Sequence, residues 1–297
     1  MKIFIIGSLN MDLVIKAPYM PVNGETLSGE GFMTNPGGKG ANQAAAAGKL
    51  GGNVYMVGCV GDAFGDQLKQ TLNGYNVHTD YVKHVSGISS GIAVIVVVDG
   101  DNRIILDAGS NAKVDESIID DALSTAEPGD YLVCQLEIPM QAVSYALSQG
   151  KKKGMVTVLN PAPATKLPEG ILQYCDYFIP NQSEAQIYTG IYPENEESAK
   201  SCADKLKQFG VKNVIITMGT HGSVYVGENG YVKVDSFKVD AIDTTAAGDT
   251  FVGALVTRLS EGADIKTAMT FASKASSITV TRRGAQQSIP YREEVKI

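Results

Sequence analysis

From about residue 110 onward, short apolar runs alternate with segments in which apolar residues recur at helical spacing. The runs have the length of buried strands, and the segments between them are long enough to be helices. This alternation is typical of a parallel sheet that is covered by helices on both faces. We therefore expect an α/β fold with a central, mostly parallel sheet. The strand-like runs are 131–135, 155–159, 177–179 and 214–217, and helical segments include 140–149 and 198–209.

The first third of the chain has a different pattern. After a first apolar strand, residues 11–15 look extended, and a stretch punctuated by Pro and Gly leads to a helix that starts near Gly38. Residues 90–106 are a second extended block, in which GIAVIVVV turns over and returns as RIIL. We expect a single α/β domain over 1–297, with the strands of a small lid sheet inserted at about 11–37 and 89–108.

Apolar residues occupy both alternating positions of GIAVIVVV. Both faces of the small sheet should therefore be covered, since successive side chains of a strand point to opposite faces. One face could close over a ligand, and the other could meet a second copy of the chain in a homodimer. Periodicity alone also allows a different interpretation, in which this run is a buried strand of the main sheet.

Composition and charge exclude several classes of partner. The 297 residues carry a net charge of −7, spread along the chain, which argues against nucleic acid or an anionic membrane as the main partner. The four cysteines form no Cys-x-x-Cys pair and the three histidines are far apart, so a zinc site is not expected. The N-terminus has too short an apolar run for a secretion signal or membrane span. With reduced, buried thiols, these features predict a cytoplasmic protein.

The stretch Asn-Pro-Gly-Gly-Lys-Gly-Ala-Asn-Gln-Ala, residues 35–44, is neither a Walker A loop nor a dinucleotide fingerprint. It offers uncovered backbone next to a helix N-terminus, together with Lys39 and Asn42 on one face of the first turn. Backbone amides, a Lys donor and an Asn that both donates and accepts suit hydroxyl groups. The alternative is a Gly-rich turn that only caps an Ala-rich helix.

The stretch Asp-Thr-Thr-Ala-Ala-Gly-Asp-Thr-Phe, residues 243–251, precedes a second amphipathic segment. Ala247, Gly248 and Asp249 would then occupy a helix N-terminus, where free N–H groups and the helix dipole favour an anion. A phosphate in transfer could be held there, and Asp249 could accept the proton of an attacking hydroxyl. An Asp at a helix start is, however, far more often a simple cap.

Polar residues also follow three of the predicted strands. Ligands of doubly wound sheets bind beyond the carboxyl ends of the strands, so these residues could face one crevice, although loop polarity would explain each of them alone. They are Gln135-Leu136-Glu137, Asn181-Gln182-Ser183-Glu184 and Thr217-Met218-Gly219-Thr220-His221-Gly222.

Taken together, GSLNMD near the start, NPGGKGANQA, the pair Asn181 and Glu184, and DTTAAGD resemble the ribokinase-like family of carbohydrate kinases. The resemblance runs from Ile5 to about Pro290, with the motifs in the order of the family. It implies the ribokinase-like fold and ATP-dependent phosphorylation of D-ribose at the 5-hydroxyl, with Mg²⁺ and a monovalent cation, usually K⁺, as cofactors.

The resemblance also implies roles for individual residues. Asp249 would be the base, next to an anion hole of small residues, and Gly248 would also contact the nucleotide. The sugar-binding residues would be Asn10, Asp12, Gly38, Lys39, Asn42 and Glu137, with Asp249 at the reacting hydroxyl. The anion hole would comprise Ala246, Ala247 and Gly248. The nucleotide, phosphates and magnesium would be served by Asn181, Glu184, Thr217, Gly219 and Gly222. The cation loop would comprise Asp243, Thr245, Gly284 and Ser288.

Two departures from the family pattern and three alternative functions remain. Many members have Gly in place of Ala246, which narrows the subgroup, and Gln287 stands in the cation loop where Pro is common.

The substrate could instead be 2-deoxyribose or fructose, because a few hydroxyl contacts decide specificity. A catalytically silent sugar sensor would use the same pocket. A nicotinamide-dependent oxidoreductase lacks its glycine fingerprint after the first strand.

Overall fold

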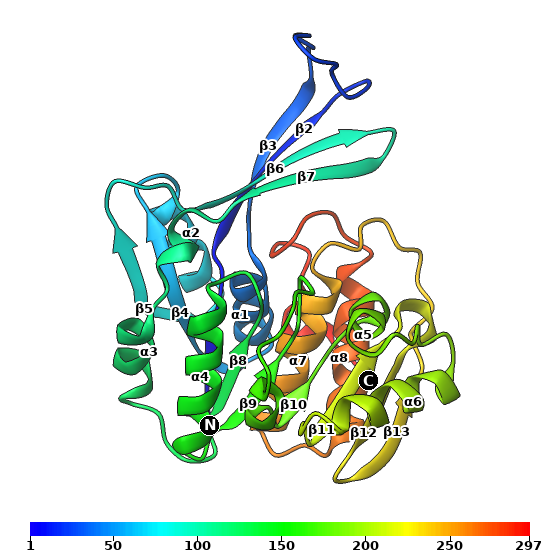
Figure 1. Cartoon of the computed structure of the whole chain (residues 1–297). Coiled ribbons are helices and arrows are strands. Elements are labelled where there is room, and N and C mark those ends of the chain that lie inside the picture. The colour runs from blue at the N-terminus through cyan, green and yellow to red at the C-terminus, as the bar shows by residue number, and fades with distance from the viewer.

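The computed structural model describes all residues from 1 to 297. It contains a large sheet of nine strands in the order β13-β12-β11-β10-β9-β8-β1-β4-β5 and a small sheet in the order β3-β2-β6-β7 (Figure 1). Neighbouring strands from β11 to β5 run parallel, and only β12 and β13 are antiparallel additions at one edge. The large sheet comprises β1 (Lys2–Ile6), β4 (Asn53–Gly61), β5 (Val77–Val85), β8 (Tyr131–Cys134), β9 (Val156–Leu159), β10 (Tyr177–Phe178), β11 (Asn213–Thr217), β12 (Ser223–Gly227) and β13 (Gly230–Val234).

Helices cover both faces of the large sheet, as expected. The strands supply alternate side chains to the two sides, so that Ile3 and Ile5 of β1 join one core while Phe4 and Ile6 join the other. The first core is closed by α1 (Lys39–Lys49), α2 (Gly65–Asn73), α7 (Ala247–Ser260) and α8 (Ile265–Thr279). The second core is closed by α3 (Glu116–Leu123), α4 (Met140–Lys152), α5 (Gln182–Thr189) and α6 (Glu196–Lys207). None of these helices is long and apolar enough to cross a bilayer.

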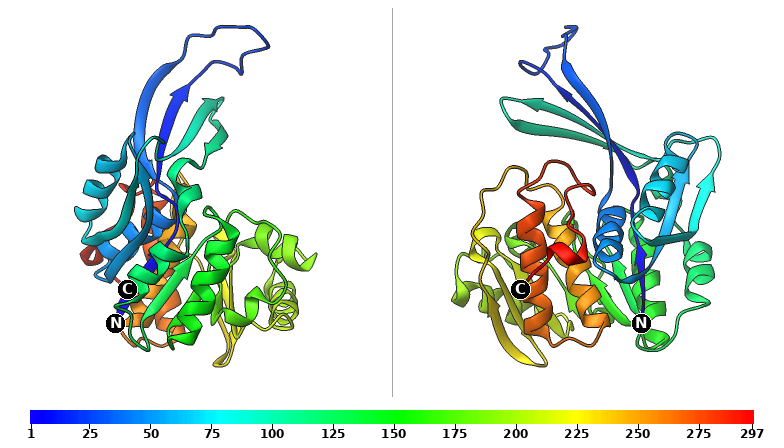
Figure 2. Two further views of the ribbon diagram at one scale, coloured as in Figure 1. Left: turned by 60° about the vertical axis from the view of Figure 1, so that its left-hand side comes forward. Right: turned by 180° about the vertical axis from the view of Figure 1, so that it is seen from behind.

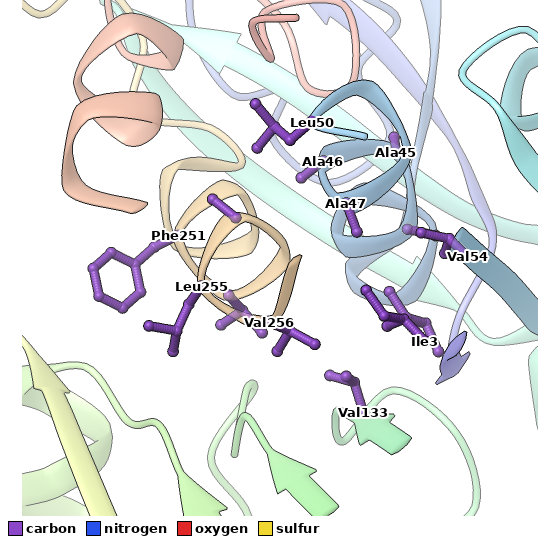
Figure 3. Close-up of a cluster of buried hydrophobic side chains, with 14 of the residues drawn as sticks. Ile3, Ala45, Ala46, Ala47, Leu50, Val54, Val133, Phe251, Leu255 and Val256 are labelled. Carbon is purple, nitrogen blue, oxygen red and sulfur yellow. The ribbon is translucent and has the colours of Figure 1, made fainter. Parts of the chain in front are cut away.

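The packing of α1 on α7 brings two parts of the chain together that are about two hundred residues apart. Figure 3 shows the two helices side by side, with the small side chains of Ala45, Ala46 and Ala47 on α1. A Cβ atom at Gly253 of α7 would lie only 2.6 Å from the carbonyl oxygen of Gln43. The close approach therefore requires glycine at this position, and it sets the N-terminal turns of both helices next to each other.

The small sheet projects from the body of the molecule, beyond the carboxyl ends of the large sheet's strands (Figures 1 and 2). It comprises β2 (Asn10–Lys16), β3 (Glu30–Gly37), β6 (Gly91–Val98) and β7 (Asp101–Asp107). The expected segments are 11–37 and 89–108, and the strands lie within them except that β2 begins one residue earlier, at Asn10. The hairpin of β6 and β7 turns at Asp99 and Gly100, both with positive φ, so the turn is two residues long.

Within one chain, apolar side chains on both faces of the small sheet are left exposed, so their cover by a ligand and a second copy stays a prediction. Val94 and Ile105 are paired across β6 and β7 and share one face, while Ile104 lies on the other. All three are exposed, Ile105 at 71%, because the outer part of the sheet stands clear of the body. The small sheet thus presents apolar side chains on both faces.

Candidate active site

Asp249, the predicted base, lies in the first turn of α7, which begins at Ala247 as the sequence indicated. Its carboxylate is 8% exposed and accepts hydrogen bonds from two neighbouring residues of α1. Asn42 Nδ2 donates to Oδ2 at 3.0 Å, and Gln43 Nε2 donates to Oδ1 at 3.1 Å. The close packing of α1 on α7 therefore places both amide donors on one carboxylate and leaves part of it open to a ligand.

The small residues before Asp249 leave backbone amides uncovered. Ala246 has φ of 59°, an uncommon conformation for a residue with a side chain, and it turns the chain into α7. The amide of Ala247 donates to the carbonyl oxygen of Thr244 at 3.2 Å, but the amides of Gly248 and Asp249 have no acceptor in the chain. No atom would lie within 4 Å of a Cβ at Gly248. This open helix N-terminus suits an anion.

A cavity of about 200 Å³ opens in front of these amides. It brings together side chains that follow several strands of the large sheet and the first turn of α7, as expected for an α/β sheet. Most of the predicted residues for the base, anion and phosphates line it, whereas Asp12, Asn42 and Glu137 lie outside its lining. The lining residues are Lys39, Asn160, Ala162, Ile179, Asn181, Glu184, Thr217, Thr244, Ala246, Ala247, Gly248, Asp249 and Val252.

Glu137 lies on the sugar side of the predicted site, where the strand ends of β1 and β8 meet the N-terminus of α1. Its Oε2 accepts from Ser8 Oγ at 2.6 Å and from the Lys39 amide at 3.0 Å. Burial opposes the charge of the Lys39 ammonium, but the carboxylates of Asp249, Glu137 and Glu184 outweigh it and raise the pKa of Lys39. Lys39 therefore stays charged between the sugar residues and the phosphate end of the cavity.

Asp12 lies in β2, the strand that leads into the small sheet. Burial, and then the neighbouring Glu137, raise the pKa of its carboxyl to about 7. Both protonation states are thus accessible near neutral pH, so Asp12 can either donate to or accept from a hydroxyl. Asn10, two residues earlier, uses its Oδ1 to accept from Asn111 Nδ2 at 2.7 Å. Its Nδ2 has no acceptor in the chain and is free to donate to a sugar.

Asn181 and Glu184 form a capping box at the start of α5. The Glu184 amide donates to Asn181 Oδ1 at 2.8 Å, and Glu184 Oε2 accepts from the Asn181 amide at 2.8 Å. Burial raises the pKa of Glu184. No group of three or more His, Cys, Asp or Glu side chains in the chain forms a metal cage. These residues fit a Mg²⁺ ion that keeps its waters and is held mainly by phosphate oxygens, because that is how Mg²⁺ usually binds with nucleotides.

The nucleotide residues follow β11. Thr217 ends that strand, forms an isolated β-bridge with Asn181 and lines the cavity. Gly219 and Gly222 bound the short 3₁₀ turn Gly219–His221, which leads into β12. No atom would lie within 4 Å of a Cβ at Gly219, so the turn leaves room for a planar or ribose group beside it. The predicted nucleotide residues therefore share the strand end next to the phosphate residues.

The predicted cation residues lie in the loops before α7 and after α8. The carboxylate of Asp243 accepts from the amides of Thr245 and Gly284, both at 2.9 Å, and so joins the two loops. Burial works against ionisation of Asp243, but these hydrogen bonds outweigh it and lower its pKa. A charged carboxylate that joins the two loops fits a monovalent cation. Ser288 Oγ donates to the Ala285 carbonyl oxygen, and Gln287 reaches Asn35 at 3.4 Å.

Sequence reasoning missed four residues of this region. Gln43 donates to the Asp249 carboxylate, and Asn160 accepts from the same Gln43 amide. Thr244 lines the cavity, and Ser8 donates to Glu137. Thr244 and Asn160 had a signal, because they stand beside a motif and at the end of a predicted strand. Gln43 stands inside the motif 35–44, next to Asn42, but its burial and its contact with Asp249 depend on the packing of α1 on α7, which the motif does not encode.

Comparisons with known proteins agree with this site. The model of the pfkB family of carbohydrate kinases matches residues 1–292. A ribokinase of Schizosaccharomyces pombe is 43% identical over 99% of this chain and 96% of its own length. A deoxyribokinase of Salmonella typhi is 37% identical over 99% of this chain and 97% of its own.

The fold agrees equally well. The structure of Arabidopsis thaliana ribokinase complexed with ribose and ATP superimposes with a TM-score of 0.90 at 32% identity, covering 99% of this chain and 96% of that chain. An open helix N-terminus with a buried Asp, a full-length family match and this structural likeness agree with one another. The chain belongs to the pfkB family of carbohydrate kinases.

Proposed function

We propose that this protein transfers the γ-phosphate of ATP to the 5-hydroxyl of D-ribose, giving ribose 5-phosphate and ADP. The observation that carries the proposal is the buried Asp249 carboxylate next to the open amides of Gly248 and Asp249. The 43% identity to a ribokinase over nearly the full length of both chains supports ribose as the substrate.

Asp249 is proposed as the general base. The sugar O5–H bond breaks and its proton moves to the Asp249 carboxylate, while O5 bonds to the γ-phosphorus and the bond from that phosphorus to the β-bridging oxygen breaks to release ADP. The amides of Gly248 and Asp249 and the helix dipole of α7 stabilise the negative charge on the phosphoryl oxygens. The charged Lys39 adds to that stabilisation from the other side of the cavity.

The sugar is proposed to bind between the N-terminus of α1 and the base of the small sheet. Asn42 Oδ1 is buried without a hydrogen-bond partner, so a sugar hydroxyl would satisfy it. Asp12 and Glu137 supply carboxylate acceptors, and Asn10, Gly38 and Lys39 complete the set. Polar groups that are unsatisfied until ligand binds give the selectivity for hydroxyl positions.

We propose that ATP occupies the side of the cavity formed by Thr217, Gly219 and Gly222. Mg²⁺ would neutralise charge on the phosphates, with Asn181 and Glu184 reaching it through water. Asp243, Thr245, Gly284 and Ser288 are proposed to hold K⁺. A cation there would support the loop that precedes α7.

We also propose a homodimer formed through the small sheet. An exposed edge strand and apolar side chains on both faces are features that a symmetric partner would cover. The small sheet would then act as a lid over the sugar. The four cysteines are all unpaired and buried, which fits the reducing environment of the cytoplasm.

A second candidate substrate is 2-deoxyribose. The deoxyribokinase of Salmonella typhi is 37% identical to this chain over nearly its whole length, so the family match does not separate the two sugars. They differ by one hydroxyl. A site that pairs buried polar groups with the 2-hydroxyl would discriminate strongly against the sugar that lacks it.

The test is ADP formation with ribose, 2-deoxyribose and fructose for the wild type and for Asp249→Asn. We expect the highest kcat/KM with ribose and a loss of about 10²- to 10⁴-fold in kcat for the variant, because the base is removed while its shape is kept. An unchanged melting temperature would show that folding is intact. Wild-type-like turnover by Asp249→Asn would refute the mechanism. Faster turnover of 2-deoxyribose than of ribose would make 2-deoxyribose the preferred substrate.

A further inference from the structure

A chain of buried side-chain amides leads to the Asp249 carboxylate, and of its members only Asn160 lines the cavity. Gln135 Nε2 donates to Gln43 Oε1 at 2.7 Å, and Gln43 Nε2 donates to Asp249 Oδ1 at 3.1 Å and to Asn160 Oδ1 at 3.0 Å. Gln43 and Gln135 are completely buried and Asn160 nearly so. Buried amides of this kind are costly unless they are paired, so their arrangement is informative.

The donor-to-acceptor direction of this chain of amides is set by the groups at both of its ends. Asn160 Nδ2 donates to the backbone carbonyl oxygen of Ile179 at 2.8 Å, and that carbonyl can only accept. Asn160 must then present its oxygen to Gln43. Gln43 must present its Nε2 group to two oxygens at once, and its own oxygen is left for Gln135.

Gln135, at the far end of this chain of amides, has an unsatisfied polar atom that agrees with the same direction. Gln135 Oε1 is buried without a hydrogen-bond partner. It lies over Gly7 at the end of β1, where a Cβ atom would come within 2.1 Å of it. Reversing the Gln135 amide would turn its oxygen toward Gln43 and oppose the orientation that Asp249 needs. One unsatisfied oxygen is thus retained while Gln43 keeps its donor on the carboxylate.

We propose that Gln43 is a positioning residue for the phosphoryl transfer, which it assists by fixing the orientation and charge of the Asp249 carboxylate. This rests on the proposed function, in which Asp249 is the base. Asn42 holds Oδ2 and Gln43 holds Oδ1, so rotation of the carboxylate about its bond to Cβ is opposed at both oxygens. Each oxygen keeps a lone pair for the sugar hydroxyl.

Gln43 is absent from the cavity lining and is fully buried, so it does not touch substrate. Its removal should therefore lower kcat and leave KM for the sugar nearly unchanged. Hydrogen bonds to charged groups are strong, and losing one that supports the base corresponds to about a ten- to hundredfold fall in kcat.

The experiment uses Gln43→Met, which keeps the length of the side chain and removes the donor. We expect the fall in kcat with the KM for the sugar nearly unchanged, because the sugar-binding residues keep their places. Gln43→Glu, which replaces the amide donor with a second acceptor oxygen beside the Asp249 carboxylate, should lower kcat at least as much.

Thr257→Val is the matched control. Thr257 is a buried polar residue of α7 at the same interface with α1, and its Oγ1 donates to Gly253 O within the helix. We expect a comparable change in melting temperature with kcat and the KM for the sugar unchanged. An equal loss of kcat in this control would mean that Gln43→Met acts through stability alone, which would overturn the proposal.

A double-mutant cycle separates this inference from the proposed function. In the Asp249→Asn background, Gln43→Met should cost little further kcat, because its effect passes through the carboxylate. Full additivity of the two losses, or a normal kcat for Gln43→Met beside an inactive Asp249→Asn, would refute the role of Gln43 and leave the base in place. Normal turnover by Asp249→Asn would instead refute the base itself.

Discussion

Asp12 carries a carboxyl group whose protonation changes near neutral pH, and it lies where the sugar is proposed to bind. Its pKa is raised to about 7 by burial and by Glu137. A sugar hydroxyl donates a stronger hydrogen bond to a carboxylate than to a neutral acid. The affinity for sugar should therefore rise with pH through this range.

The first prediction is that KM for ribose falls by up to about tenfold between pH 6 and pH 8, following ionisation of Asp12. In Asp12→Asn, KM should be higher and independent of pH over this range. Steady-state kinetics at several pH values measure both. A wild-type KM that does not change with pH, or a variant that keeps the trend, would contradict this role for Asp12.

The same group makes a prediction about stability. In the folded chain Asp12 keeps its proton up to about pH 7, whereas the unfolded chain loses it near the ordinary value of 3.8. Between these values the folded state binds more protons, so the contribution of Asp12 to stability falls as pH rises. Asp12→Asn should melt at a higher temperature than the wild type at pH 8, with the difference shrinking toward pH 4. Thermal unfolding without ligand at both pH values tests this, and an equal difference at both would contradict it.

At the scale of elements, the packing of α1 on α7 determines where the proposed base lies. Gly253→Ala would put a methyl group against the Gln43 carbonyl, which is backbone and cannot swing away. We expect a loss of about 1–3 kcal/mol in stability. We also expect a fall in kcat, because the helices must move apart and Asp249 would lose its alignment with Asn42 and Gln43.

Gly150→Ala in α4 is the control for Gly253→Ala. Gly150 is also a buried helix glycine, but the nearest atoms to a new methyl group would be the side-chain ends of Leu132 and Thr157, at 3.0 and 3.1 Å. These can shift, and α4 lies on the opposite face of the sheet from α1 and α7. Its kcat should stay normal. Equal kcat values for the two variants would show that the spacing of α1 and α7 does not align the base.

Local patterns predict the elements of this fold better than the contacts between them. The apolar runs 131–135 and 155–159 become β8 and β9, and the small residues before Asp249 mark the start of α7. The order of strands in the sheet comes from pairings that no local pattern encodes. For the same reason the contact between Gln43 and Asp249 is not predictable from one sequence, since it depends on helices brought together by tertiary packing.

At the scale of the whole molecule, the small sheet is the part that a single chain leaves uncovered. Apolar side chains are exposed on both of its faces, and every residue of the edge strand β7 is exposed. The sequence predicted apolar positions of both parities, and with them a cover from a ligand on one face and a second copy of the chain on the other. A second copy, related by two-fold symmetry, would supply the same apolar surface in return.

Ile105→Asp tests this assembly. Ile105 is 71% exposed in the single chain, and in a two-fold dimer each substitution would place an unpaired charge in the interface twice. We expect the wild type to have twice the 31.4 kDa mass of one chain by light scattering at micromolar concentration, and the variant to have the mass of one chain. KM for the sugar should rise in the variant, because the small sheet would lose its support.

Ile187→Asp provides the comparison, since Ile187 of α5 is 64% exposed and lies away from the small sheet. It should remain a dimer, because a charge on a surface that faces water costs little. If both variants were dimers, the interface would lie elsewhere. If the wild type were a monomer, the exposed apolar faces would need another explanation. A monomeric Ile105→Asp with normal KM would show instead that the dimer forms through the small sheet without helping it to bind sugar.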